Sequence, residues 1–177
     1  MSDPATYESA SDSMRTRFYS DWVDWITNGE PVDIRDTSGA RKTPIVLKQA
    51  GGGSSYIPQI YWHNVETDFP IDHSKHCVRF SDEMLGSGQS AFRSGNTGCR
   101  KAKYTTNGFI IIQIFFAKAA FAGDHRRLSV IARDIFRPRN LVNNPVWYKN
   151  AYFTDMPPTE KFFRTDVFVD YQYDELI

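Results

Sequence analysis

The sequence predicts an α+β fold, with a central mixed or antiparallel β-sheet flanked by two main α-helices and a long β-hairpin-like arm. Apolar residues recur at helical spacing in two segments, around residues 14–26 and 128–136. Segments with the period of two that is typical of strands lie between and after these helices. Because 177 residues suffice for one core and are too few for two, we expect residues 1–177 to form a single domain.

The first helix follows a small, polar and acidic stretch, residues 1–12, which we expect to be a flexible N-terminus. Ser11 or Ser13 is the expected N-cap, and Asn28-Gly29 is the expected stop. Residues 30–55 contain a short apolar run and the coil-forming GGGSS, so they predict a loop insertion with at most a small hairpin. The helical face predicted to be buried consists of Met14, Phe18, Trp22, Trp25 and Ile26.

Three strands are expected before the second helix. YIPQIYWHN (residues 56–64) has β character, and Pro58 favours an edge position. HCVRFS (residues 76–81) alternates as a half-buried strand does. GFIIIQIFF (residues 108–116) is apolar at both parities, which predicts a central strand of a sheet that is covered on both faces.

The second helix is predicted from Leu128, Ile131, Ala132, Ile135 and Phe136, with Gly123-Asp124 as its cap and Pro138 as its terminator. NPVWYKNAYF and RTDVFVDYQYDE predict two closing strands. In the second of these, Asp166 and Asp170 invite comparison with paired catalytic carboxylates. Their spacing instead predicts contact with solvent, or with basic residues of a neighbouring subunit.

The bulk composition narrows the function classes. Lys and Arg number 21, equal to Asp and Glu, so no global field recruits nucleic acid or an anionic membrane. The apolar run around residues 109–116 falls short of the ~20 residues of a membrane helix, and we expect a soluble protein. The two cysteines, Cys77 and Cys99, predict a reducing compartment rather than a disulfide framework. An aromatic content of 15 % supplies apolar area for a core and also makes protein interfaces an option.

Few residues point to chemistry. His73, His76 and Cys77 are potential zinc ligands, but neither a fourth ligand nor a C-x2-C motif accompanies them. No Ser or Cys stands in a nucleophile motif. His125, at a helix start, would suit an anion or only a solvated first turn. We therefore expect no enzyme, no cofactor and no metal, with a small zinc-dependent or hydrolytic enzyme as the alternative.

Residues 82–107 form the predicted extended arm. From residue 89 to 106 this stretch has four basic residues and no acid. Phe92 and Tyr104 are interleaved with them, so contact with nucleic-acid phosphates and bases is one interpretation. An arm that orders against a protein neighbour is the other, and it also explains the apolar Met84 and Leu85. The basic residues are Arg93, Arg100, Lys101 and Lys103.

The order of these segments resembles the tail terminator (tail completion or minor tail) proteins of long-tailed bacteriophages. The resemblance covers residues 56–175. Relative to that family, residues 30–55 look like an insertion. The matching segments are IYWHNVETDFP, HCVRF, a polar Gly-rich excursion, TTNGFIIIQIFF, LSVIARDIFR, VWYKNAYF and the final YQYDE.

The resemblance implies a structural, non-enzymatic virion protein. It would form a hexameric ring on the head-proximal end of the tail tube, stop tube polymerisation and provide the interface for head–tail joining. The implied partners are further copies of itself, the tail tube protein, a head-completion or connector protein and DNA passing through the lumen, with no membrane. The implied location is the tail or neck of the virion, and the host cytoplasm during assembly. Another neck protein, such as a head-completion or connector protein, is the closest alternative.

The arm supplies the expected contacts with other subunits or the tail. The candidate residues are Met84, Leu85, Phe92, Arg93, Arg100, Lys101, Lys103 and Tyr104, with Tyr171 and Tyr173 as further possibilities.

Overall fold

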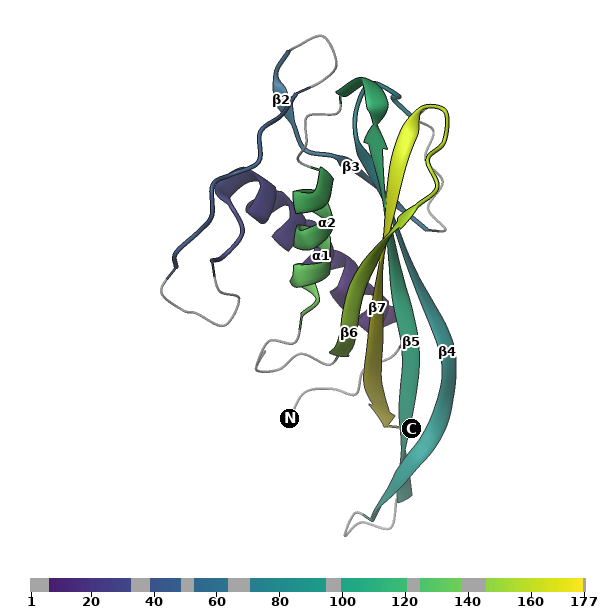
Figure 1. Cartoon of the computed structure of the whole chain (residues 1–177). Helices are drawn as coiled ribbons and strands as arrows, with labels where there is room; N and C mark the ends of the chain where they lie inside the picture. The colour runs from purple at the N-terminus through teal and green to yellow at the C-terminus, as the bar shows by residue number, and fades with distance from the viewer. Residues whose placement is uncertain are drawn as a thin grey trace.

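The computed structural model describes residues 7–32, 39–48, 53–63, 71–94, 100–120, 125–137 and 146–176, with the backbone alone at residues 7, 89–94, 100–103 and 176. Figure 1 shows a long twisted sheet with both helices on one of its faces. The strand order is β3-β4-β5-β7-β6, in which β3 is parallel to β4 and the other neighbours are antiparallel. The α+β class and the mixed sheet are thus confirmed. The strands are β3 (Gln59–Trp62), β4 (Cys77–Ser94), β5 (Arg100–Ala117), β6 (Val146–Met156) and β7 (Phe162–Leu176).

The first helix, α1 (Tyr7–Asn28), begins earlier than predicted. The expected flexible stretch up to residue 12 is wrong from Tyr7 onward, and residues 1–6 lie outside the described part of the chain. The reason is burial, since Ala10 and Ser11 are both enclosed and extend the predicted buried face by one turn. The predicted N-cap at Ser11 or Ser13 is therefore wrong.

The predicted end of α1 is confirmed. Gly29 has φ +88°, a left-handed conformation that favours glycine after a helix. A Cβ at this position would overlap the carbonyl oxygen of Lys42, so the returning chain passes directly against it. The segment that follows holds an isolated bridge between Pro31 and Arg41 and a two-stranded antiparallel sheet. That sheet, β1 (Leu47–Lys48) with β2 (Ser55–Tyr56), is the small hairpin expected in the insertion; residues 33–38 and 49–52 lie outside the described part.

The core lies between the helices and one face of the sheet. The second helix, α2 (His125–Ile135), follows the short 3-10 helix η1 (Lys118–Ala120); the predicted cap at Gly123-Asp124 lies outside the described residues. Phe18 of α1 lies 5.2 Å from the Phe80 ring of β4 and 6.1 Å from Phe136, measured between ring centroids. All five apolar residues predicted to be buried in each helical segment are buried.

Within the part of the chain that the structure describes, no helix covers the second face of the sheet, which corrects the prediction for the central strand. On β5, Ile110, Ile112 and Ile114 are fully buried beneath the helices. Phe109, Ile111 and Phe115 point to the other side and are only partly buried. The two helices lie on the same face, so neither of them covers the apolar residues at the alternate positions of β5 (Figure 1). We call this second side the outer face.

No helix within the described residues has the length and apolarity needed to cross a membrane.

Candidate assembly surface: the arm and the outer face

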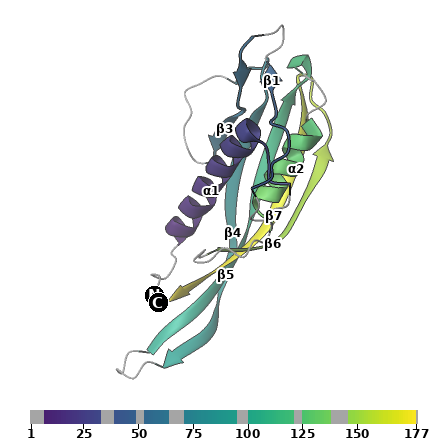
Figure 2. The same ribbon diagram turned by 90° about the vertical axis from the view of Figure 1, so that its left-hand side faces the viewer.

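The arm predicted at residues 82–107 is a two-stranded ribbon that continues the sheet. β4 and β5 stay paired from Cys77–Phe115 to Ser94–Arg100, whereas β7 accompanies β5 only as far as Lys103. Figures 1 and 2 show that the ribbon runs past the end of β7 and past both helices. Over its described residues, this Gly- and Ser-rich stretch is therefore a paired hairpin arm and not a loose loop. Residues 95–99, with Cys99, lie outside them.

Two irregularities shape the arm. The register shifts between Met84 and Gly86, and again between Gln89 and Ala91. A bulge leaves one residue without a ladder partner, bends the strand and increases its twist. At the first shift, Met84 and Leu85 are 53 % and 70 % exposed to solvent. These neighbouring apolar side chains are exposed as a contact surface requires.

The root of the arm is held by buried polar contacts. The Tyr171 hydroxyl donates to the carbonyl oxygen of Glu83 at 3.2 Å, and Gly108 leaves the space through which the Tyr171 side chain passes. Asp82 is buried and forms an ion pair with Arg15 of α1 at 3.3 Å. The first helix and the sheet thus fix the direction in which the arm leaves.

Tyr171 and Tyr173 are not surface contacts, which corrects that part of the prediction. They are 1 % and 0 % exposed and their rings stack at 6.3 Å on the helix-covered side. The alternation that buries Val167 and Val169 continues through them.

The remaining candidates are placed less completely. Tyr104 is half-buried on β5. The backbone of Phe92 and Arg93 lies in β4, and that of Arg100, Lys101 and Lys103 lies in β5. The side chains of these five residues are outside the described part of the chain.

The outer face carries an aromatic stripe that sequence reasoning missed. Tyr152 and Phe168 stack at 5.3 Å with an interplanar angle of 24°, and Ile111 is the register partner of Phe168 on the next strand. Tyr152 is 56 % exposed, and Trp147, further along the same strand, is 50 % exposed. Alternation in the two closing strands hinted at these residues, but only the strand register brings them together.

Carboxylates border this stripe. Glu83 and Asp170 are the register partners of Phe109 on its two sides, so in one row across the sheet an aromatic side chain lies between two carboxylates. Asp170 accepts a hydrogen bond from the Asn150 amide at 2.9 Å. Glu83 is exposed to solvent. The row combines an apolar centre with negative rims, which suits a basic partner.

The prediction for Asp166 is contact with solvent or with basic residues of a neighbouring subunit, and the structure corrects it. Asp166 is buried and accepts two hydrogen bonds from Arg164 of the same strand, at 2.7 and 2.5 Å. The hydrogen bond to Asp166 raises the pKa of the Arg164 guanidinium above its usual value.

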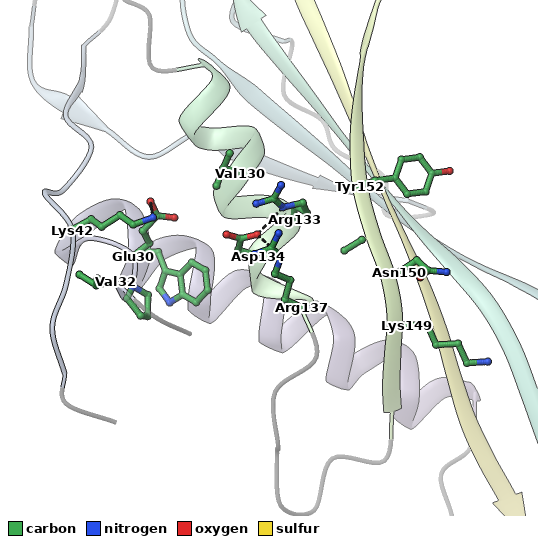
Figure 3. A pocket seen from close by; sticks show the side chains of 13 residues that line it. Glu30, Val32, Lys42, Val130, Arg133, Asp134, Arg137, Lys149, Asn150 and Tyr152 are labelled. Carbon is green, nitrogen blue, oxygen red and sulfur yellow. Dashed lines mark hydrogen bonds and ion pairs between the residues drawn. The ribbon is translucent and has the colours of Figure 1, made fainter. Parts of the chain in front are cut away.

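A groove of about 1030 Å³ lies between the end of α1, α2 and β6 (Figure 3). Its carboxylates have basic partners in the wall. Glu30 pairs with Lys42 at 2.9 Å, and Asp134 pairs with Arg133 at 2.7 Å and with Arg137 at 3.1 Å. Figure 3 also shows that Lys149, Asn150 and Tyr152 point to the opposite side of β6, toward the outer face. The groove is thus walled by internal ion pairs.

The histidines and Cys77 make structural contacts. His76 is buried, and its Nδ1 accepts the backbone N–H of Ala117 at 3.0 Å. Burial raises the pKa of the Cys77 thiol to about 11, which disfavours the thiolate that zinc binds. His73 is exposed and packs 5.3 Å from Phe162. Among the residues that the structure describes, no three His, Cys, Asp or Glu side chains gather as metal ligands would.

The start of α2 is also held by contacts. His125 packs edge-on against Phe116 at 5.5 Å. Arg127 donates to the carbonyl oxygen of Thr43 and lies 4.0 Å from Glu30. Arg126 lies 3.9 Å from Asp155. These side chains join α2 to its neighbours, so the first turn is not simply solvated.

Comparison with protein-family models and with curated proteins found no match for this chain.

Proposed function

We propose that this chain is a tail terminator of a long-tailed bacteriophage. In this role six copies form a ring on the head-proximal end of the tail tube, prevent further polymerisation and present a surface to a head-completion or connector protein. The observation that carries the proposal is the arm, a paired ribbon that extends beyond the packed helices and exposes Met84 and Leu85 at a bulge. The sequence resemblance supplies the identity of the assembly.

The physical requirements of a ring support the proposal. A closed ring is built by head-to-tail contacts, in which one patch of a subunit meets a different patch of the next. The arm and the outer face are two such patches, and each exposes large apolar side chains. A ribbon that is already paired also loses less conformational entropy on binding than a loop would. The net charge of zero limits repulsion when six copies gather around a channel that passes DNA.

The decisive experiment shortens the arm without disturbing the sheet. Replacing residues 90–103 by Asn-Gly would close the ladder at the Gln89–Tyr104 pair with a two-residue turn. This change removes only the Lys103–Leu176 pair from the β5–β7 ladder. We expect a folded protein that neither forms rings nor caps tail tubes, as judged by native mass and by electron microscopy with tubes.

A single substitution tests the apolar contact of the arm separately from the length of the arm. Leu85→Ser should weaken capping, because it removes an exposed apolar contact from the arm. Val46→Ser is the matched control, since Val46 is 61 % exposed in the insertion, away from the arm. If the shortened protein caps tubes like the wild type, the assignment of the arm is wrong. Binding to heads, with no binding to tubes, would instead identify a head-completion or connector protein.

A further inference from the structure

We propose that the arm of one copy binds across the outer face of the next copy, with its basic tip over the carboxylates of Glu83 and Asp170. This inference rests on the proposed function and deepens it by naming the surface that receives the arm. The supporting observation is the charge complementarity between the arm and the Glu83–Asp170 row, which cannot contact each other within one molecule.

The receiving row holds two carboxylates and an aromatic ring, and Lys149 of β6 points to the same side of the sheet (Figure 3). Glu83 and Asp170 flank Phe109 in one row of the sheet, and the Tyr152–Phe168 stack lies beside it. Aromatic side chains with about half of their surface in solvent, such as Tyr152, are typical anchors of an interface. Neither of the two described α-helices lies over this row, because both pack on the opposite face of the sheet (Figure 1).

The arm has the opposite charge. Residues 89–106 contain four basic side chains and no acid, although the chain as a whole has equal numbers of both. The two strands of the arm pair to the end of the described ribbon, at Ser94 and Arg100. The positive charge is therefore concentrated at one end of an extended element.

A single molecule cannot bring the two charges together. Lys101 lies eight residues beyond Phe109 on the same continuous strand. At about 3.3 Å per residue this is a separation of about 26 Å, well beyond the reach of a side chain. Arg93 pairs with Lys101 across the ribbon and is equally distant. Only a second copy can place an arm over the Glu83–Asp170 row, and the resulting contact is head-to-tail, as a ring requires.

Charge reversal tests the pairing. Arg93→Glu with Lys101→Glu reverses the arm, and Glu83→Lys with Asp170→Lys reverses the face. We expect either pair of changes to weaken self-association by about tenfold or more, and the four changes in one chain to restore it. Lys48→Glu with Lys161→Glu is the matched control, because both lysines are exposed and lie away from the arm. If the four changes together assemble no better than either pair, the inference is overturned.

Cross-linking tests the location directly. A photoreactive benzoylphenylalanine in place of Tyr152 should link to residues 89–106 of another copy, recognised by mixing isotopically light and heavy protein. Links to other segments, or a protein that stays monomeric at every concentration, would overturn the inference. Tube capping with links elsewhere would refute this interface and leave the proposed function standing. Arm-to-face links in a protein that ignores tubes would refute the function and leave the interface standing.

Discussion

The substitution Gly108→Ala tests whether close packing between Gly108, Tyr171 and the Glu83 carbonyl stabilises the root of the arm. Gly108 lies on β5 where the Tyr171 side chain crosses toward β4 and donates to the carbonyl oxygen of Glu83. A Cβ built on Gly108 falls inside 3.0 Å of that carbonyl oxygen and of two atoms of Tyr171. The carbonyl belongs to a paired strand and Tyr171 is 1 % exposed, so neither neighbour can move away freely.

The expected cost follows from these contacts. Overpacking a well-packed site costs typically about 1–3 kcal/mol. Displacing the Tyr171 hydroxyl adds about 1 kcal/mol for the lost hydrogen bond to Glu83. Gly108→Ala should therefore lower the free energy of unfolding by about 3 kcal/mol. With a slope of about 2 kcal/mol per molar, the urea midpoint should fall by about 1.5 M.

The assay is urea unfolding followed by circular dichroism, with Gly88→Ala as the matched control. Gly88 lies on the same ribbon, but a Cβ there would meet nothing within 4 Å, so its replacement should change stability by less than about 0.5 kcal/mol. Tyr171→Phe combined with Gly108→Ala should remain destabilised, because the ring and the Glu83 carbonyl still obstruct the Cβ. A Gly108→Ala midpoint equal to that of wild type, or an equal loss in Gly88→Ala, would refute the reasoning.

Two further predictions concern Arg17 and Cys77. Arg17→Gln should lower the free energy of unfolding by about 2 kcal/mol in thermal unfolding, because the guanidinium donates at 3.0 and 2.6 Å to the carbonyl oxygen of Ile135 at the end of α2. Thr16→Gln, at an exposed position, is the control. An equal effect of both substitutions would contradict this role of Arg17. In a Cys99→Ser background, alkylation of folded Cys77 at pH 8 should run about a hundredfold slower than in urea, since burial raises its pKa from 9.0 to about 11 and depletes the thiolate. The rate should rise steeply up to the folded pKa, and equal rates in the folded and unfolded protein would show that the thiol is accessible.

Local periodicity was sufficient for much of the fold. The helical spacing of Phe18 and Trp22, the stop at Gly29 and the edge position after Pro58 were all predicted and are confirmed. These features depend on the conformational preferences of neighbouring residues, which the sequence displays directly. The arm was likewise predicted as an extension from its alternating pattern and turn residues.

Other features depend on elements distant in the chain, and there the predictions failed. The apolar residues of β5 at both parities suggested two covered faces, but whether a second layer exists depends on where both helices pack. The strand alternation predicts a solvated Asp166, but Arg164 pairs with it in a buried site. Tyr171 looked available for contact, although its alternation with Val169 already placed it on the buried side.

By itself, the sequence determined the class of fold, the two helices, the strand segments and the existence of a basic arm, because periodicity, turn chemistry and composition are local properties. Only the tertiary structure decided that both helices occupy one face, that Phe109 lies between Glu83 and Asp170, and that the arm leaves the sheet as a paired ribbon. Those facts follow from strand register and helix packing, which bring together residues far apart in the sequence, such as Glu83 and Tyr171, which are 88 positions apart.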